Sequence, residues 1–281
     1  MSRTLVFLTR TLLALASATP AFAQTAASPA AAAAAELALT RLDCGTSPGP
    51  SDVARFSDVF GHRGLMVPIV YSCYLVKHGS DYLVWDTGQA MTAGAVAPKV
   101  SVVDQLAQLG VKPEQVRFVG ISHYHPDHTG QVASLPQATL LIGKGDWDVI
   151  ASPQPPANAP AAPFKHWLAG GAGKVEPLPL DKDVFGDGTV VVLATPGHTP
   201  GHHSLLVRLP QTGAVLITGD LAHFRENYDS LGVPPFNTGR AETLASLDRF
   251  KKIVANLNAT VIIQHDGRDI GKLPAFPAAA R

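Results

Sequence analysis

The run Ser122-His123-Tyr124-His125-Pro126-Asp127-His128-Thr129-Gly130 decides what fold and chemistry we expect of this chain. It follows the apolar run 116–121 and places three imidazoles and one carboxylate within six residues. His123 and His125 are two residues apart, so both can point to one side of a turn. The chain then turns, so Asp127 and His128 can bind at a second metal position. Zinc favours imidazole and carboxylate ligands, so the run predicts metal binding.

Further candidate ligands follow short β-like runs, namely His198 in TPGHTPGHHS, Asp220 in ITGD and His265 in IIQHD. These motifs predict two neighbouring metal ions. The ligands expected for the first ion are His123, His125 and His198. Those expected for the second are Asp127, His128 and His265, with Asp220 bridging the two ions. The expected cofactors are two divalent ions, most simply zinc, with iron, manganese or cobalt also suited to such ligands.

A water molecule shared by two such ions becomes a strong nucleophile. Its pKa falls from about 15.7 toward about 7, so hydrolysis requires no serine or cysteine nucleophile. The sequence therefore predicts a metal-dependent hydrolase.

Composition limits the class of substrate. The chain has 281 residues, of which 46% are hydrophobic, enough for one large core or two fused halves. Its formal net charge is zero and its sequence shows no basic stripe. Nucleic acid is therefore not an expected partner, and a small-molecule ester or lactone is.

The N-terminus has the features of a Sec-type signal peptide. Arg3 and Arg10 supply positive charge, 12–18 is a short apolar stretch, and Ala21-Phe22-Ala23 resembles a cleavage site before Gln24. We expect a periplasmic or secreted protein. The apolar stretch is too short to span a bilayer, so no stable membrane anchor is expected after cleavage, although an uncleaved anchor is the alternative.

The rest of the chain divides into two parts. Residues 24–36 form an Ala-rich linker, and 37–281 are expected to form a single hydrolase domain. Runs rich in Val, Ile and Leu predict strands at 37–43, 67–77, 81–86, 116–121, 138–142, 188–194, 203–208, 213–218 and 259–264. The predicted helices are 99–110, 144–151 and 240–257.

Two segments predict loops over the site. Residues 45–66 are rich in Gly, Ser and Pro but carry apolar side chains, and 152–163 are rich in proline. The first loop would serve as a lid or as a homodimer interface. Candidates for a substrate wall are Phe56, Phe60, Met66, Phe224 and Tyr228, although ordinary core packing is the commoner role of such residues.

Cys44 and Cys73 both lie in strand-like runs. An exported protein permits a disulfide, provided that the Cα atoms come close enough. The sequence alone favours two buried thiols and leaves the disulfide open.

The ligand pattern resembles the metallo-β-lactamase superfamily from about residue 38 to 270. Within it, TPGHTPGHHS, Asp220 and Gln264-His265-Asp266 resemble the quorum-quenching N-acyl-homoserine lactonase branch. The resemblance implies an α+β fold of the αββα type, with two mixed β-sheets flanked by helices and the metal site at one edge. It also implies that a metal-bridging hydroxide opens the lactone ring of N-acyl-homoserine lactones.

The resemblance further implies roles for residues beside the ligands. Asp86, in WDTG, would orient a ligating imidazole. His202 follows His198 by four residues, and this spacing predicts a supporting position just behind the site. The predicted catalytic residues are Asp127 and Asp220, as proton carriers, and His223. His223 stands where lactonases carry a tyrosine, three residues after the bridging aspartate, and its imidazole could donate to the developing oxyanion.

His223 also keeps an alternative open. A histidine there resembles the exported, methyl parathion hydrolase-like branch, which implies an organophosphate or aryl-ester hydrolase. A β-lactamase is disfavoured because those enzymes generally lack a bridging aspartate such as Asp220. A glyoxalase II-like thioesterase would have a basic C-terminus, whereas this one offers only Arg268 and Lys272. The intact ligand set argues against a non-enzymatic binding protein.

Overall fold

The computed structural model describes residues 1–2 and 36–281, and its folded part contains two β-sheets. One sheet has the order β1-β2-β3-β4-β5-β6 and the other β11-β10-β9-β8-β7. The first sheet consists of β1 (Leu37–Asp52), β2 (Met66–His78), β3 (Asp81–Trp85), β4 (Val116–Ile121), β5 (Thr139–Gly143) and β6 (Val175–Leu178). The second consists of β7 (Lys182–Asp183), β8 (Val190–Ala194), β9 (His203–Leu209), β10 (Gly213–Ile217) and β11 (Thr260–Ile262).

Both sheets are mixed. In the first, β1, β2 and β3 pair antiparallel, and β3 to β6 pair parallel. In the second, β10 and β11 pair parallel and the remaining pairs are antiparallel. This pattern confirms the fold class that the resemblance implied.

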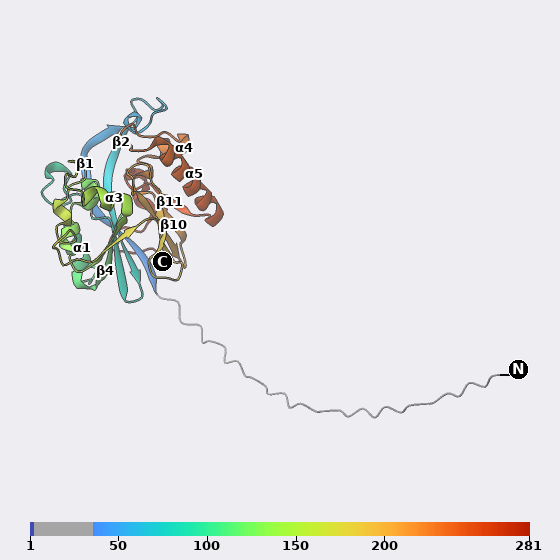
Figure 1. Cartoon of the computed structure of the whole chain (residues 1–281). Coiled ribbons are helices and arrows are strands. Elements are labelled where there is room, and N and C mark those ends of the chain that lie inside the picture. The colour runs from blue at the N-terminus through green and yellow to red at the C-terminus, as the bar shows by residue number, and fades with distance from the viewer. Residues whose placement is uncertain (3–35) are drawn as a thin grey trace. The chain divides into compact units, whose positions relative to one another are not determined.

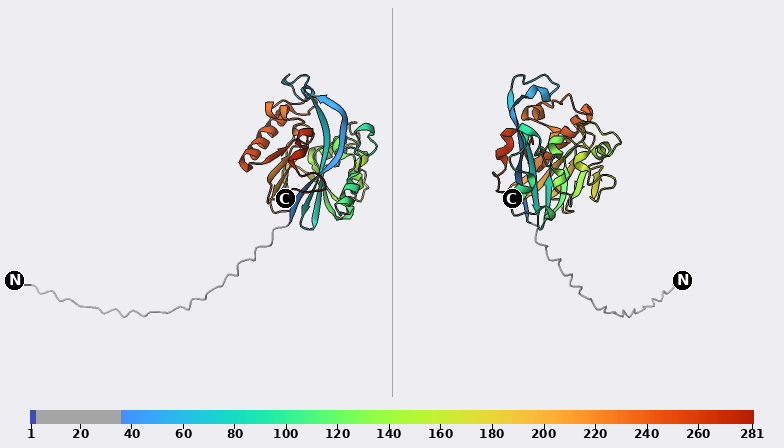
Figure 2. Two further views of the ribbon diagram at one scale, coloured as in Figure 1. Left: turned by 180° about the vertical axis from the view of Figure 1, so that it is seen from behind. Right: turned by 90° about the vertical axis from the view of Figure 1, so that its left-hand side faces the viewer.

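Helices cover the outer faces of the two sheets. They are α1 (Val102–Gln108), α3 (Lys144–Ile150), α4 (Arg225–Ser230) and α5 (Arg240–Leu257), whereas the short α2 (Pro126–Thr129) lies in the ligand-bearing segment after β4. Figure 1 shows α1 and α3 on one side of the strands and α4 and α5 on the other, and Figure 2 gives two further views.

Three apolar clusters hold these layers together. Trp85 of β3 and Ile217 of β10 share the cluster between the sheets. Leu106 of α1 belongs to the cluster on the outer face of the first sheet. Phe250 of α5 packs with Leu216 on the outer face of the second. Burial of these side chains from water is the main force that joins the four layers.

The expected strands and long helices are all present, but some segments differ from the prediction. The segment 45–66 is not all loop, because β1 continues to Asp52 and pairs with the start of β2 through two irregularities. Its glycines and prolines are tolerated because β1 is an edge strand. Strands β6 and β7 were not predicted: β6 contains a proline, and β7 has two residues.

The predicted signal peptide and nearly all of the linker lie outside the described residues. Within residues 36–281, no helix is long and apolar enough to cross a membrane.

Cys44 and Cys73 form a disulfide, so the preference for two buried thiols was wrong. Strands β1 and β2 are neighbours, with Leu42 opposite Cys73 in the ladder. This pairing brings the two Cα atoms to 5.8 Å, within the range that a disulfide requires. The sequence did not show the register that places the two residues together.

Reduction of this disulfide is expected to destabilise the fold. The bond joins residues separated by 29 positions, and removing a cross-link of that span costs about 3.5 kcal/mol in the free energy of unfolding. Urea unfolding with and without reductant measures the loss. The Cys44→Ser/Cys73→Ser double variant should be less stable and insensitive to reductant. Quantitative labelling of two free thiols in the untreated native protein would contradict the pairing.

Candidate metal centre

The predicted ligands converge at one edge of the two sheets, on loops that follow four strands. His123, His125, Asp127 and His128 follow β4, whereas His198, Asp220 and His265 follow β8, β10 and β11. They form two groups, and the ligand atoms within each group lie within 4.8 Å of one another. The first group is His123, His125, His198 and Asp220. The second is Asp127, His128 and His265.

Asp220 divides its two carboxylate oxygens between these groups. Oδ1 lies 3.1 Å from His128 Nε2 and 2.9 Å from His265 Nε2. Oδ2 lies 3.3 Å from His198 Nε2 and 3.6 Å from His123 Nε2. One oxygen for each group is the arrangement of a carboxylate that bridges two cations.

The polar atoms here fit metal ions better than they fit one another. His125 Nδ1 lies 2.9 Å from His123 Nε2 and 3.0 Å from His198 Nε2, so three imidazole nitrogens meet at one point. Asp220 Oδ1 is buried and accepts no hydrogen bond from the described residues. Converging lone pairs without donors are what a bound cation completes. The two groups therefore fit a dinuclear metal site.

Acceptors behind the imidazoles fix their tautomers. His198 Nδ1 donates to Asn237 Oδ1 over 2.8 Å, and His265 Nδ1 donates to the Val70 carbonyl over 2.8 Å. With the proton on Nδ1, the Nε2 lone pair points at the site. Sequence analysis did not identify Asn237 or Val70 in this role.

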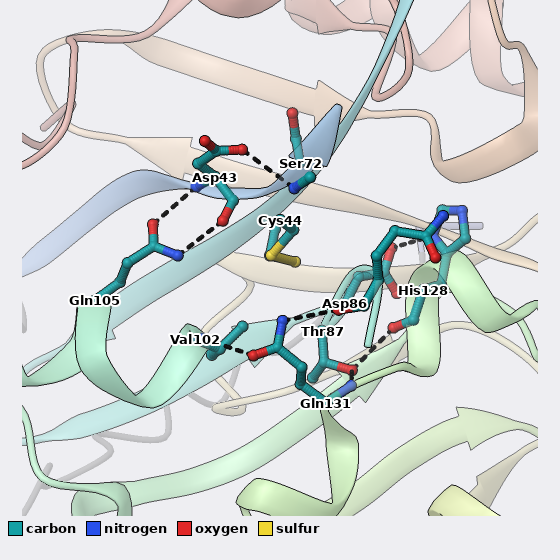
Figure 3. The surroundings of a disulfide bond; sticks show 12 residues. Asp43, Cys44, Ser72, Asp86, Thr87, Val102, Gln105, His128 and Gln131 are labelled. Carbon is teal, nitrogen blue, oxygen red and sulfur yellow. Dashed lines mark hydrogen bonds and ion pairs between the residues drawn. A yellow bond between two sulfur atoms is a disulfide. The ribbon is translucent and has the colours of Figure 1, made fainter. Parts of the chain in front are cut away.

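Asp86 lies beneath the second group. Its Oδ2 accepts from His128 Nδ1 over 2.8 Å and from Gln264 Nε2 over 2.7 Å. Its Oδ1 accepts from the Ser122 backbone over 2.7 Å. A single buried carboxylate thus positions a ligand, the loop after β4 and the loop after β11. Figure 3 shows Asp86 beside His128, close to the disulfide.

His202 lies behind Asp220, outside both ligand groups. Its Nδ1 donates to the Thr195 carbonyl over 3.0 Å, and its Nε2 accepts from the Asp220 backbone N–H over 2.9 Å. Burial lowers the pKa of His202 to about 3, so the ring is neutral and can accept that bond. His202 therefore holds the backbone of the bridging residue.

Burial and neighbouring charges set the protonation of the ligands. Burial by itself would raise the pKa of Asp220, but His265 and His223 together with the other imidazoles hold it well below its usual value. Asp220 therefore remains an anion. Burial lowers the pKa of His198 well below its usual value. The His198 ring is accordingly neutral, the form in which imidazole binds a metal.

Asp146 of α3 was missed by sequence analysis. Its Oδ2 accepts from the Tyr124 backbone over 3.0 Å and from Thr199 Oγ1 over 2.8 Å, and its Oδ1 accepts from the Gly201 backbone over 2.6 Å. It thereby ties the loop that carries His125 to the loop that carries His198. Burial raises the pKa of its carboxyl to about 7, although these three hydrogen bonds act to lower it. A lone aspartate in a short helix carries no sequence signal for such a role.

A cavity of about 240 Å³ opens over the ligands. Its lining consists of Phe56, Ile69, Tyr71, His125, Asp127, His198, Asp220, His223, Phe236 and His265. The loop over 152–163 also approaches the ligands, since Asn158 Nδ2 lies 3.4 Å from His125 Nε2.

Only Phe56 of the proposed substrate wall lines this cavity. Phe224 is fully buried against Val53 and Val67, and Tyr228 packs in the cluster on the outer face of the second sheet, so both predictions were wrong. Phe60 and Met66 point to solvent, with exposed fractions of 77% and 52%. Apolar character alone did not reveal which way each side chain faces.

Ile69, Tyr71 and Phe236 form the remainder of the wall and were not predicted. Phe236 lies in the loop between α4 and α5. The centre of its ring lies 5.9 Å from that of His198 and 5.7 Å from that of His223. An exposed aromatic residue in a Pro-Pro-Phe-Asn loop was the only available signal.

His223 lies inside the cavity beside the bridge. Its Nε2 is 3.1 Å from Asp220 Oδ2, and its ring is 4.7 Å from that of Phe56. Its Nδ1 is buried and has no hydrogen-bond partner among the described residues. A polar group thus borders the space in which a substrate would lie.

Comparison with known proteins places these features in context. Residues 67–265 match the family model described as Metallo-beta-lactamase superfamily. The N-acyl homoserine lactonase AttM of Rhizobium radiobacter is 33% identical in an alignment of length 233 that covers 71% of this chain and 82% of that protein. An N-acyl homoserine lactonase of a Bacillus species is 26% identical in an alignment of length 235 that covers 76% of this chain and 88% of that protein.

A solved structure shares the fold. It is an N-acyl homoserine lactone hydrolase with the product N-hexanoyl-L-homoserine bound at its catalytic metal centre. It aligns with a TM-score of 0.73 at 22% identity, over 88% of this chain and 99% of that one.

Asp86→Asn should weaken one metal position selectively. The amide loses the charge that orients His128 and presents a donor to groups that already donate. Loss of such a supporting carboxylate typically costs about 10–100-fold in metal affinity. We expect the second group to lose its ion under limiting metal while the first retains its own, measured by elemental analysis and native mass spectrometry. Asp81→Asn, at the far end of β3, is the control. Unchanged affinity for both ions would show that Asp86 does not support the site.

Proposed function

Since the chain belongs to the metallo-beta-lactamase superfamily and to its N-acyl-homoserine lactonase branch, we propose that it hydrolyses the lactone ring of N-acyl-homoserine lactones. The observation that carries the proposal is the bridging position of Asp220, with one oxygen facing each ligand group. The identity to AttM supports the choice of substrate.

The metal ions are proposed to be zinc. The two groups offer imidazoles and carboxylates and no thiolate, a set that suits zinc. When bound, two such ions polarise a carbonyl and activate a shared water.

The chain's own residues orient the substrate and move the proton. The water adds to the lactone carbonyl carbon, the ring C–O bond breaks, and the ring oxygen becomes the hydroxyl of the acyl-homoserine product. Asp127, whose side chain is 25% exposed in the cavity, is placed to carry the proton from the water toward that oxygen. His223 would donate to the former carbonyl oxygen. Phe56, Ile69 and Phe236 would contact the acyl chain.

A phosphotriester or aryl-ester hydrolase is the second candidate. The observation that favours it is His223, which stands at the cavity in place of the tyrosine of the lactonases. An imidazole can donate a hydrogen bond to a phosphoryl oxygen as well as to a carbonyl oxygen.

We also propose that the protein works outside the cytoplasm. The signal-like sequence before Gln24 supports this. The disulfide between Cys44 and Cys73 supports it independently, because such bonds persist in oxidising compartments.

A substrate panel tests the proposed function. The zinc-loaded protein should release acid from N-acyl-homoserine lactones with a higher kcat/KM than it shows for paraoxon, phenyl acetate or a β-lactam. Asp220→Asn should lose most bound metal and at least about a hundredfold in turnover, because the bridge is removed. Lactone hydrolysis no faster than in buffer would refute the proposal, and a preference for paraoxon would support the second candidate.

His223→Phe tests the donor beside the bridge. The ring can remain between Phe56 and Phe236, but the hydrogen bond to the carbonyl oxygen is lost. We expect kcat for lactones to fall about a hundredfold with little change in KM or metal content, the usual effect of removing one oxyanion donor. A rise in KM at constant kcat would assign His223 to substrate binding instead.

A further inference from the structure

Tyr71 of β2 lines the metal cavity and has no role in the chemistry described above. Its ring meets that of His265 edge-on, with centroids 5.4 Å apart and an interplanar angle of 82°. His265 belongs to the second ligand group, together with Asp127. His223 Nε2, by contrast, lies beside the Asp220 oxygen that faces the first group. Within the cavity, Tyr71 therefore lies beside the second ligand group and His223 beside the first.

The backbone around Tyr71 is shaped to place this side chain. The ladder between β1 and β2 passes from Asp43–Ser72 to Thr46–Val70, so Cys44 and Gly45 lie opposite Tyr71 alone. Such a bulge redirects the side chains of a strand and commonly occurs beside active sites.

Gly45 is the residue that this bulge requires. Its φ is +122°, and an added Cβ would lie 2.3 Å from the Val96 carbonyl oxygen and 3.2 Å from Tyr71 Cδ2. A side chain there would displace the tyrosine ring. The Cys44–Cys73 disulfide fastens the bulge to β2 two residues beyond Tyr71 (Figure 3).

The phenol has a hydrogen available for the cavity. A phenol hydroxyl carries one hydrogen that it can donate to an acceptor in the cavity. A phenol is normally protonated at neutral pH, so it can donate a hydrogen bond without charge or proton loss.

We propose that the Tyr71 hydroxyl donates a hydrogen bond to the leaving oxygen of the substrate at the second ligand group. This inference rests on the proposed hydrolysis of lactones. As the ring C–O bond breaks, negative charge collects on the ring oxygen until that oxygen takes the proton that came from water. Tyr71 stabilises this charge and transfers no proton of its own. Tyr71 thus donates to the leaving oxygen, whereas His223 donates to the carbonyl oxygen.

Tyr71→Phe removes this hydrogen bond and keeps the ring. The experiment compares N-hexanoyl-homoserine lactone with the matching homocysteine thiolactone, whose sulfur leaves more easily and accepts hydrogen bonds poorly. We expect kcat for the lactone to fall about tenfold to a hundredfold, with KM within about twofold, and kcat for the thiolactone to fall far less. Tyr82→Phe on β3 is the matched control and should leave both rates unchanged. Equal losses for lactone and thiolactone, or a change in KM alone, would overturn the proposal.

Product binding supplies a readout independent of turnover. The ring-opened product carries the former leaving oxygen as a hydroxyl, whereas N-hexanoyl-2-aminobutyrate lacks it. Calorimetry should show that the native protein binds the hydroxylated product roughly fivefold more tightly, and that Tyr71→Phe abolishes this preference. No preference in the native protein would overturn the proposal even if the variant failed to fold. If native protein and Tyr82→Phe both fail to open the lactone, the proposed function fails and this inference with it. If both are active and Tyr71→Phe matches them, only this inference fails.

Discussion

The rest of the structure depends on one buried carboxylate that faces two clusters of imidazoles. Asp220 is only 3% exposed, and an isolated anion at that depth would be very costly. The imidazoles around it keep it ionised, and the hydrogen bond from its backbone N–H to His202 Nε2 holds its backbone in place. The ligands that surround Asp220 come from loops after β4, β8, β10 and β11, so its burial requires strands of both sheets to end at the same place.

The site is also where the two sheets are joined by polar contacts. Gln264, after β11, donates to the Ser72 carbonyl of β2 as well as to Asp86, and His265 donates to the Val70 carbonyl. The apolar cluster between the sheets supplies non-directional adhesion. These hydrogen bonds add direction, because a small slip of one sheet against the other would break them and would misalign His265 at the same time.

Ligands could be read from the sequence because their signal is local. His123 to His128 lie within one turn, and each remote ligand follows an apolar run that ends at the same sheet edge. Several residues that hold the ligands in place could not be identified in this way. Asp146, Asn237 and Val70 act through partners 22 to 195 positions away, so no pattern near them indicates the role. The disulfide and the direction of Phe224 likewise depend on strand register and on which face is buried, which a single sequence does not reveal.

The position of His265 has a consequence for the order in which the protein becomes functional. The second ligand group cannot close until β11 has paired with β10, near the end of the chain. During synthesis the His123–His128 run emerges earlier, and at that stage the second group has only Asp127 and His128. Tight capture of the second ion is thus reserved for a completed domain. A chain that ends before β11 lacks His265 and would leave the second ligand group with only Asp127 and His128.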